Sequence, residues 1–116
     1  NRNLITIQSE ESLSAAILKM RDHSISQLPV FDGGRLVGIL TEDDLAKIMI
    51  ENTDRDIHLV KIKAVMEPPP PLVDESTPAK ALVSLVRFAK CVLVSEKGNV
   101  VGIITLTDTL KIVESS

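Results

Sequence analysis

The sequence predicts a mixed α/β (α+β) fold in which two β-α-β-β-α repeats pack as one pseudo-twofold module. The heptapeptide GILTEDD at 38–44 returns as GIITLTD at 102–108, with its glycine, its threonine and its last aspartate in register. An amphipathic helix pattern in the first half of the chain also returns in the second half. The 116 residues suit one domain, whereas each half alone is near the lower limit for a stable core. We therefore expect two repeats that share one core.

Each repeat is expected to begin with a short strand and an amphipathic helix. Apolar runs at 4–7 and 72–73 predict the opening strands. Apolar residues then recur at the i, i+3, i+4, i+7 spacing of a helix with one buried side. They are Leu13, Ala16, Ile17 and Met20 in the first repeat and Ala79, Leu82, Val83 and Val86 in the second. Ser9 and Ser12 are candidate N-caps of the first helix, and Thr77, followed by a proline, predicts the start of the second.

A β-hairpin and a further helix complete each repeat. Glycine-bearing turns predict hairpins from two strands each, at 27–31 and 35–40 and at 91–95 and 100–104. The offset between repeats is 66 at the first helix and 64 from the hairpin onward, so the second repeat lacks two residues between them. The threonine after each hairpin opens the last helix, whose apolar residues are Leu45, Ile48 and Met49 in one repeat and Leu110, Ile112 and Val113 in the other.

A linker separates the two patterns. It contains a polar stretch at 51–56 and four prolines at 68–71, and proline stiffens such a connection into an extended form. Basic side chains within the linker are expected to be solvated. We assign residues 1–66 to the first repeat with its linker and residues 67–116 to the second repeat.

Composition and charge argue against several classes of partner. The net charge is −3, and aromatic residues make up 2% of the chain with no Trp or Tyr, whereas nucleic-acid binding favours basic surfaces and stacking side chains. No apolar run approaches the roughly 20 residues of a membrane-spanning helix. Cys91 is the single cysteine, so it forms no internal disulfide, and we expect it to be buried and inert. These features predict a cytoplasmic location, and the first residue, which is not Met, fits a piece of a longer protein.

The repeated threonine and aspartate stand where a strand ends and a helix begins. If Thr41 is an N-cap, Asp44 follows one turn later on the same side, and Thr105 and Asp108 repeat this arrangement. One interpretation is a capping box, in which each side chain satisfies a free N–H at the helix start. The other is a nucleotide site, in which the carboxylate accepts ribose hydroxyls while the threonine and the helix N–H groups bind a phosphate. Both interpretations are open at this stage.

The ordered set of elements, present twice, resembles the CBS-domain family, whose tandem pairs are also called Bateman modules. The resemblance covers essentially the whole chain and is carried by LVGILTEDD at 36–44, VVGIITLTD at 100–108 and HSISQLPV at 23–30. It implies a regulatory module that binds an adenosine-containing ligand and commonly forms a homodimer. The implied ligands are AMP, ADP, ATP or S-adenosylmethionine, with AMP favoured, and no cofactor is required.

The resemblance also implies which residues bind the ligand. Thr and Asp of each corner would hold phosphate and ribose, which assigns Thr41, Asp44, Thr105 and Asp108. The segment entering each hairpin would pack the adenine, which assigns Ile25, Ser26, Leu28 and Pro29 in the first repeat and Ala89, Lys90, Val92 and Leu93 in the second. The second segment departs from the family pattern, because Leu93 replaces a proline and two residues are missing, although Lys90 could face a phosphate.

The three acidic residues at 42–44 would repel a polyphosphate at the first corner. We therefore expect two unequal sites and a monophosphate or nucleoside-like ligand. A magnesium site on the same residues is disfavoured, because consecutive helical side chains point in different directions.

Two other function classes stand beside the regulatory module. A structural dimerisation module with no nucleotide ligand would use the same corners only as helix caps. An enzyme is the least favoured class, because the sequence pairs no nucleophile with a general base and shows no metal triad. Direct binding measurements with AMP, ADP, ATP and S-adenosylmethionine separate the first two classes.

Overall fold

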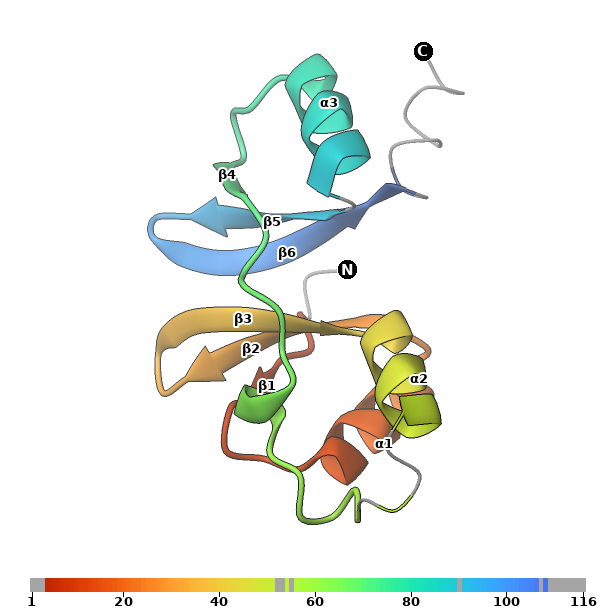
Figure 1. The fold of residues 1–116 in the computed structure, drawn as a ribbon. Helices are drawn as coiled ribbons and strands as arrows, with labels where there is room; N and C mark the ends of the chain where they lie inside the picture. Colours follow the sequence, from red (N-terminus) through yellow and green to blue (C-terminus); the bar gives the residue numbers. More distant parts are fainter. Residues whose placement is uncertain (1–3, 52–53, 55, 90, 107, 109–116) are drawn as a thin grey trace. The chain divides into compact units, whose positions relative to one another are not determined.

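The structure, a computed structural model, describes residues 4–51, 54, 56–89, 91–106 and 108. Its elements are, in chain order, β1 (Ile7–Gln8), α1 (Leu13–His23), β2 (Gln27–Asp32), β3 (Arg35–Thr41), α2 (Glu42–Glu51), the short 3-10 helix η1 (Ile62–Ala64), β4 (Leu72–Asp74), α3 (Ala79–Ala89), β5 (Cys91–Glu96) and β6 (Asn99–Thr105). These residues form a mixed α+β fold with two three-stranded sheets and three α-helices (Figure 1). The fold class predicted from the sequence is confirmed.

Contacts divide the chain into two units. One unit is Ile5–Pro69, which we call the first repeat. The other combines Asn1–Leu4 with Pro70–Ser116, and we call it the second repeat. Each repeat therefore has a sheet and a helical layer of its own.

In the first repeat, two helices cover one face of the sheet β1-β2-β3 (Figure 1). β1 pairs in parallel with β2, and β2 pairs antiparallel with β3. α1 buries Leu13, Ala16 and Met20, because these residues recur on one side of the helix. They form a core with side chains from the sheet, from α2 and from the chain after α2, namely Ile7, Leu28, Val30, Leu40, Leu45, Val60 and Ile62.

The second repeat builds the same hairpin at a constant offset. Gln27 pairs with Thr41 in the first repeat and Cys91 pairs with Thr105 in the second, and the other pairs shift by the same 64 positions. A β-bulge recurs at the matching place in both hairpins. The offset is 66 for the helices, since α1 and α3 have the same length and begin 66 residues apart. The two missing residues therefore lie between helix and hairpin, as predicted.

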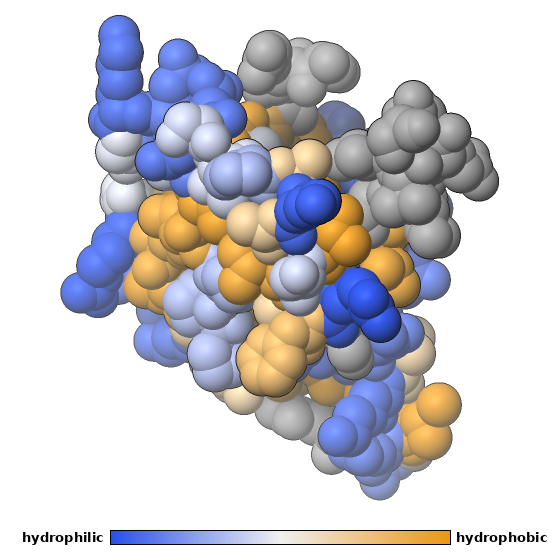
Figure 2. Space-filling view, turned by 90° about the horizontal axis from the view of Figure 1, so that it is seen from above, coloured by the Kyte–Doolittle hydropathy of each residue, from blue (hydrophilic) through white to orange (hydrophobic). Residues whose placement is uncertain are grey.

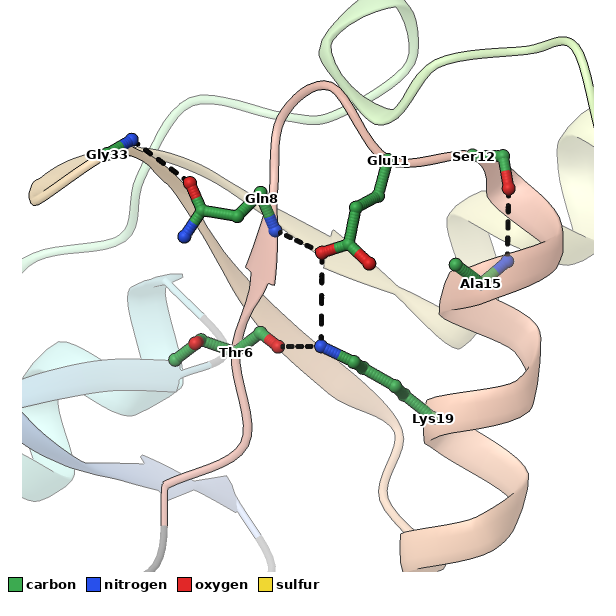
Figure 3. A network of polar contacts seen from close by, with 7 residues as sticks. All are labelled: Thr6, Gln8, Glu11, Ser12, Ala15, Lys19 and Gly33. Carbon is green, nitrogen blue, oxygen red and sulfur yellow. Dashed lines mark hydrogen bonds and ion pairs between the residues drawn. The ribbon is translucent and has the colours of Figure 1, made fainter.

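The first strand begins later than predicted. The sequence predicts a strand at 4–7, whereas β1 begins at Ile7. The chain before β1 is held by a side chain instead, because the Lys19 ammonium donates to the Thr6 carbonyl at 2.8 Å (Figure 3). Lys19 also lies 3.9 Å from the Glu11 carboxylate, which accepts a backbone N–H of β1 at 2.8 Å. This polar network joins α1 to the start of β1 without backbone pairing of residues 4–6.

The helix starts follow the predicted signals with small differences. Of the two candidate caps of α1, Ser12 takes the role, since its hydroxyl accepts the Ala15 N–H at 3.3 Å. Ser9 is buried before the helix begins. α3 begins at Ala79, one residue later than predicted. The predicted apolar residues of the last helix, Leu110, Ile112 and Val113, lie outside the described residues.

Residues 57–67 are an integral part of the first repeat, and we call them the strap; the sequence places 57–66 with the first repeat and its linker and begins the second repeat at Glu67. Val60 and Ile62 of the strap are buried in the core of the repeat. The carbonyls of Val60 and Ile57 accept the first two N–H groups of α1, at 2.9 and 3.2 Å. Because the first N–H groups of a helix have no partner within it, the strap completes the N-terminus of α1.

The strap ends in a single β-bridge to β3, at the edge of the sheet. Ile39 of β3 and Glu67 exchange both of their backbone hydrogen bonds, each 2.9 Å long. Gly38 makes this approach possible, because a Cβ there would lie 2.6 Å from the Glu67 carbonyl oxygen and 2.7 Å from the Met66 sulfur. Any side chain at position 38 would push the strap away from β3.

Several large apolar side chains lie at the surface. Phe88 of α3 is 91% exposed, and Ile50 and Leu59 of the first repeat are each 78% exposed. Figure 2 shows hydrophobic residues among hydrophilic ones on the face seen from above. Each helix in the described part of the chain is too short or too polar to cross a membrane. Scattered apolar residues are ordinary on protein surfaces and identify no site by themselves.

Candidate functional site

The first corner is the turn from β3 into α2. Thr41 ends β3, and Asp44 lies in the first turn of α2. The Asp44 carboxylate accepts the Thr41 N–H at 2.9 Å, and the Thr41 hydroxyl accepts the Asp44 N–H at 3.1 Å. The capping box is therefore formed, with both residues half-buried. Within the described residues, the second Asp44 oxygen and the Thr41 hydroxyl proton are left for a ligand.

The segment between α1 and β2 lies against this corner. The Ser26 carbonyl accepts the N–H of Glu42, the first residue of α2, at 2.9 Å. Ser24 caps α1 in the left-handed conformation, with φ 53°, and the Ile25 N–H returns to the Met20 carbonyl at 3.0 Å. This C-cap reverses the chain. It brings Ser26 beside the start of α2, so the corner and the segment form one site.

The predicted residues of this segment differ in their exposure. Ile25 and Ser26 are half-buried. Leu28 is fully buried in the core of the first repeat, and Pro29 is also buried. A ligand at the corner would therefore contact Ile25 and Ser26. Leu28 and Pro29 belong to β2 and are buried beneath the surface that such a ligand would contact.

The second corner follows β6 and uses its hydroxyl differently. The Asp108 carboxylate accepts the Thr105 N–H at 2.9 Å, and the Thr105 hydroxyl lies 3.4 Å from the Asp108 N–H. The Thr105 hydroxyl also donates to the same carboxylate oxygen at 3.0 Å. The hydroxyl proton of Thr105 is thus used within its own corner, whereas the hydroxyl proton of Thr41 has no acceptor among the described residues.

The approach to the second corner is shorter than the approach to the first. α3 ends at Ala89 and β5 begins at Cys91, so one residue replaces the three that separate α1 from β2. Ala89, which the sequence aligns with Ile25, is the last residue of α3, whereas Ile25 follows the end of α1 by two residues. The single residue between α3 and β5, Lys90, stands directly before β5 as Ser26 stands directly before β2, and it lies outside the described residues.

Of the other predicted residues of the second segment, the structure describes two. Val92 and Leu93 are fully buried on β5. Lys90, which is expected to face a phosphate, lies outside the described residues. Among the described residues, Ile25 and Ser26 stand beside the first corner, whereas Val92 and Leu93 of the second segment are buried.

Negative charge also distinguishes the two corners. The first turn of α2 carries Glu42, Asp43 and Asp44, whereas Leu106 and Asp108 stand at the first and third of these positions in the second repeat. None of the described Lys and Arg side chains forms an ion pair with the three carboxylates of α2. The helix dipole tolerates acids at this end, but they repel a phosphate. The described residues also contain no cluster of three side chains placed to hold a metal ion.

A groove of about 360 Å³ lies between α1 and α2, beside the first corner. It shares Ile25 and Glu42 with that corner. The remaining lining is aliphatic apart from one arginine, and consists of Ile17, Met20, Arg21, Leu45, Ala46 and Met49. An apolar surface therefore adjoins the polar groups of Thr41 and Asp44.

The fold defines a class of protein, the tandem module of two β-α-β-β-α repeats with a threonine–aspartate corner in each. The sequence family described as the CBS domain matches residues 1–51 and 62–115. The chain belongs to the CBS-domain family and contains a tandem pair, as its motifs predict.

Relatives with known names include enzymes of which the chain matches only a part. Inosine-5'-monophosphate dehydrogenase of Korarchaeum cryptofilum is 36% identical over 110 residues, which are 92% of this chain and 22% of the enzyme. A CBS domain-containing protein of Dictyostelium discoideum is 27% identical over 122 residues, 95% of this chain and 84% of that protein. The chain thus spans only 22% of the length of the dehydrogenase.

Solved structures show the same fold. A CBS-domain protein from Burkholderia ambifaria superposes with a TM-score of 0.86 at 24% identity, over 99% of this chain and 85% of that chain. A conserved CBS-domain protein from Thermoplasma acidophilum superposes with a TM-score of 0.81 at 29% identity, over 96% of this chain and 64% of that chain. The arrangement of strands and helices is therefore that of known CBS pairs.

Proposed function

We propose that the chain is a regulatory module that binds an adenosine-containing ligand at the first corner and signals its occupancy to an attached or associated effector. The observation that carries the proposal is the meeting of Thr41, Asp44 and Ser26 at one helix start. Membership of the CBS-domain family supports it. The proposal assigns no catalytic step to this chain.

The free groups of the first corner match the parts of a nucleoside. The second oxygen of Asp44 can accept hydrogen bonds from the two ribose hydroxyls, because a carboxylate offers about four acceptor positions. The Thr41 hydroxyl can donate its proton to a phosphate or another acceptor on the ligand. Ile25 supplies an apolar contact for the base beside these polar groups.

The charge of the first corner selects among adenosine-containing ligands. Three carboxylates in one helical turn oppose each added phosphate group. Ligand affinity should therefore fall from AMP to ADP to ATP, and S-adenosylmethionine, whose sulfonium is positive, should bind at least as well as ATP. The second corner has fewer carboxylates, but its threonine proton is already used and its approach is short. We propose one strong site for each chain.

Signalling requires that the ligand prefer one arrangement of the module over another. A ligand shifts such an equilibrium only by the difference in its affinity for the two states. We propose that the module acts as a homodimer, with apolar faces such as the groove between α1 and α2 in the contact. The effector is then any domain or protein whose activity differs between the two states.

Calorimetric titration tests the proposal with AMP, ADP, ATP and S-adenosylmethionine on the intact chain. We expect a stoichiometry of one, and Asp44→Ala should weaken AMP binding by about tenfold or more, the loss of roughly one good hydrogen bond to a charged group. Asp108→Ala should change the affinity little. Ser12→Ala is the control for stability, because it removes the cap of α1 without touching the corner.

A structural dimerisation module with no nucleotide ligand is the second candidate. The observation that favours it is that both corners already use their threonine and aspartate as caps. Absence of heat with all four ligands, together with lower stability of Asp44→Ala and Asp108→Ala, would support this candidate and contradict the regulatory one.

A further inference from the structure

The turn of the first hairpin contains the dipeptide Asp32-Gly33, and the sequence has no second Asp-Gly pair and no Asn-Gly pair. β2 ends at Asp32 and β3 begins at Arg35, so Gly33 and Gly34 are the two turn residues. Asp32 and both glycines are exposed, and Gly33 adopts φ 62°. A hairpin turn explains the glycines, but it does not require an aspartate before them, since Glu96 holds this place in the second hairpin.

An aspartate followed by glycine rearranges without an enzyme or a cofactor. The glycine nitrogen attacks the side-chain carboxyl carbon, an N–Cγ bond forms, and the amide proton leaves with the carboxyl OH as water. Water then opens the resulting five-membered succinimide at the carbonyl next to Cα, so that the main chain continues through Cβ and Cγ as isoaspartate. The water released in the first step balances the water consumed in the second. Glycine favours the attack, because it has no Cβ to hinder the approach of its nitrogen.

Gln8 of β1 holds the nitrogen that would attack. Its side-chain oxygen accepts the Gly33 N–H at 3.0 Å (Figure 3). The backbone of Gln8 is itself fixed, because it pairs beside Phe31 of β2 and its N–H donates to the Glu11 carboxylate at 2.8 Å. The hydrogen bond from Gly33 to Gln8 must break before the nitrogen can lose its proton and turn toward the Asp32 carboxyl.

The second hairpin has neither part of this arrangement. Glu96 and Lys97 stand in place of the Asp-Gly pair, so ring closure would give a six-membered ring and would be hindered by a side chain on the attacking residue. Asp74 holds the position of Gln8 beside the hairpin. Its carboxylate accepts the N–H and the hydroxyl of Ser76, at 2.9 and 2.6 Å. The second hairpin is therefore an internal control within the same chain.

We propose that Asp32 is a site of spontaneous isoaspartate formation, and that Gln8 sets its rate by holding the Gly33 nitrogen. Isomerisation adds one carbon to the backbone at the end of β2, where Asp32 pairs with Arg35. It therefore disrupts the last pair of the hairpin ladder and the side-chain bond that joins β1 to the turn. The product carries a free α-carboxylate, the group that isoaspartyl-methylating enzymes modify. The reaction requires no ligand at either corner.

Incubation of the intact chain below its unfolding temperature tests the proposal. Isoaspartate is quantified by enzymatic methylation of its free carboxylate and located by mass spectrometry of proteolytic fragments. Gln8→Met keeps the length of the side chain but removes the oxygen acceptor, and it should speed isoaspartate formation at position 32 by about fivefold, the factor that one ordinary hydrogen bond is worth. Gln8→Glu keeps an acceptor and should stay near the rate of the unchanged chain. Asp32→Glu should abolish the product.

Hydrogen exchange gives a second measurement on the same variants, because Gln8→Met should also speed exchange of the Gly33 amide. Equal rates of isoaspartate formation in Gln8→Met and the unchanged chain would overturn the role of Gln8. Isoaspartate that forms at the exposed Asp22 and Asp74 as fast as at Asp32 would contradict a specific site. A rise at all three aspartates in Gln8→Met would show that the substitution acts by unfolding the chain, and it would likewise contradict the proposal.

Discussion

Thr41 and Asp44 satisfy each other's backbone at the start of α2, with hydrogen bonds of 2.9 and 3.1 Å. Because the first N–H groups of a helix have no partner within it, this exchange stabilises α2 with or without a ligand. The same two side chains carry the groups that a nucleoside would use. Substitutions at this corner therefore change stability and binding together, and each effect needs its own measurement.

Asp44→Ala should lower the free energy of unfolding by about 1 kcal/mol in the absence of any ligand, since the Thr41 N–H loses its acceptor. Urea unfolding followed by circular dichroism measures this change. Asp43→Ala is the matched control, because Asp43 is an exposed acid in the same turn and takes no part in the capping hydrogen bonds. Equal stability of the two variants would contradict a structural role of the capping box.

The repeats were predictable from the sequence because their signals are local. Turns that require positive φ are marked by glycine, and Gly33 and Gly98 adopt φ of 62° and 85°. The corner is marked by threonine and aspartate three positions apart, and both copies form the expected hydrogen bonds. The two-residue difference in offset also predicts the shorter turn between α3 and β5.

The strap was not predictable, because its packing depends on distant parts of the chain. Val60 follows the apolar Leu59 and Ile62 stands between two lysines, a short irregular pattern that does not distinguish a linker from a buried segment. Backbone hydrogen bonds hold both residues in place: the Val60 carbonyl accepts an N–H of α1, and the Ile62 N–H donates to the turn before α1. The carbonyl of Ser26 at the corner was likewise hidden, since backbone contacts of this kind leave no side-chain signal.

Ile62→Ala should cost about 2–5 kcal/mol of stability, the usual range for removing a fully buried branched side chain. Leu59→Ala is the control within the strap, because Leu59 is 78% exposed. Thermal and urea unfolding of both variants measure the difference. A strap that acts only as a linker would give two variants of equal stability.

Glu10 should make the stability of the first repeat depend on pH in the acidic range. Its carboxylate bonds Lys61 of the strap at 2.7 Å and also pairs with Lys63, and these hydrogen bonds lower the pKa of Glu10 from 4.5 to about 2. A carboxyl whose folded pKa is lowered stabilises the protein above its unfolded pKa. That contribution is lost as the pH falls from 4.5 toward about 2.

Glu10→Gln should therefore unfold at a lower urea concentration than the unchanged chain near neutral pH, and the difference should disappear toward a pH of about 2. Both lysines and the glutamate are exposed, so the difference should be small and should shrink further at about 1 M salt. A difference that persists in strong acid would show that Glu10 acts through packing and not through its charge.

Ser24→Gly should stabilise the chain by up to about 1 kcal/mol and raise its melting temperature by a few degrees, because Ser24 caps α1 with φ 53° and glycine adopts this conformation without steric cost. The turn that it caps sets the Ser26 carbonyl beside α2, so the hydrogen bond to Glu42 should be kept. Lys97→Gly is the matched variant, since Lys97 has φ 52° in a hairpin turn away from the corner. Ser24→Val should have the opposite effect and lower the melting temperature, because a β-branched residue resists positive φ. If glycine at position 24 destabilises the chain while glycine at position 97 does not, the serine side chain and not the backbone conformation holds the turn that builds the first corner.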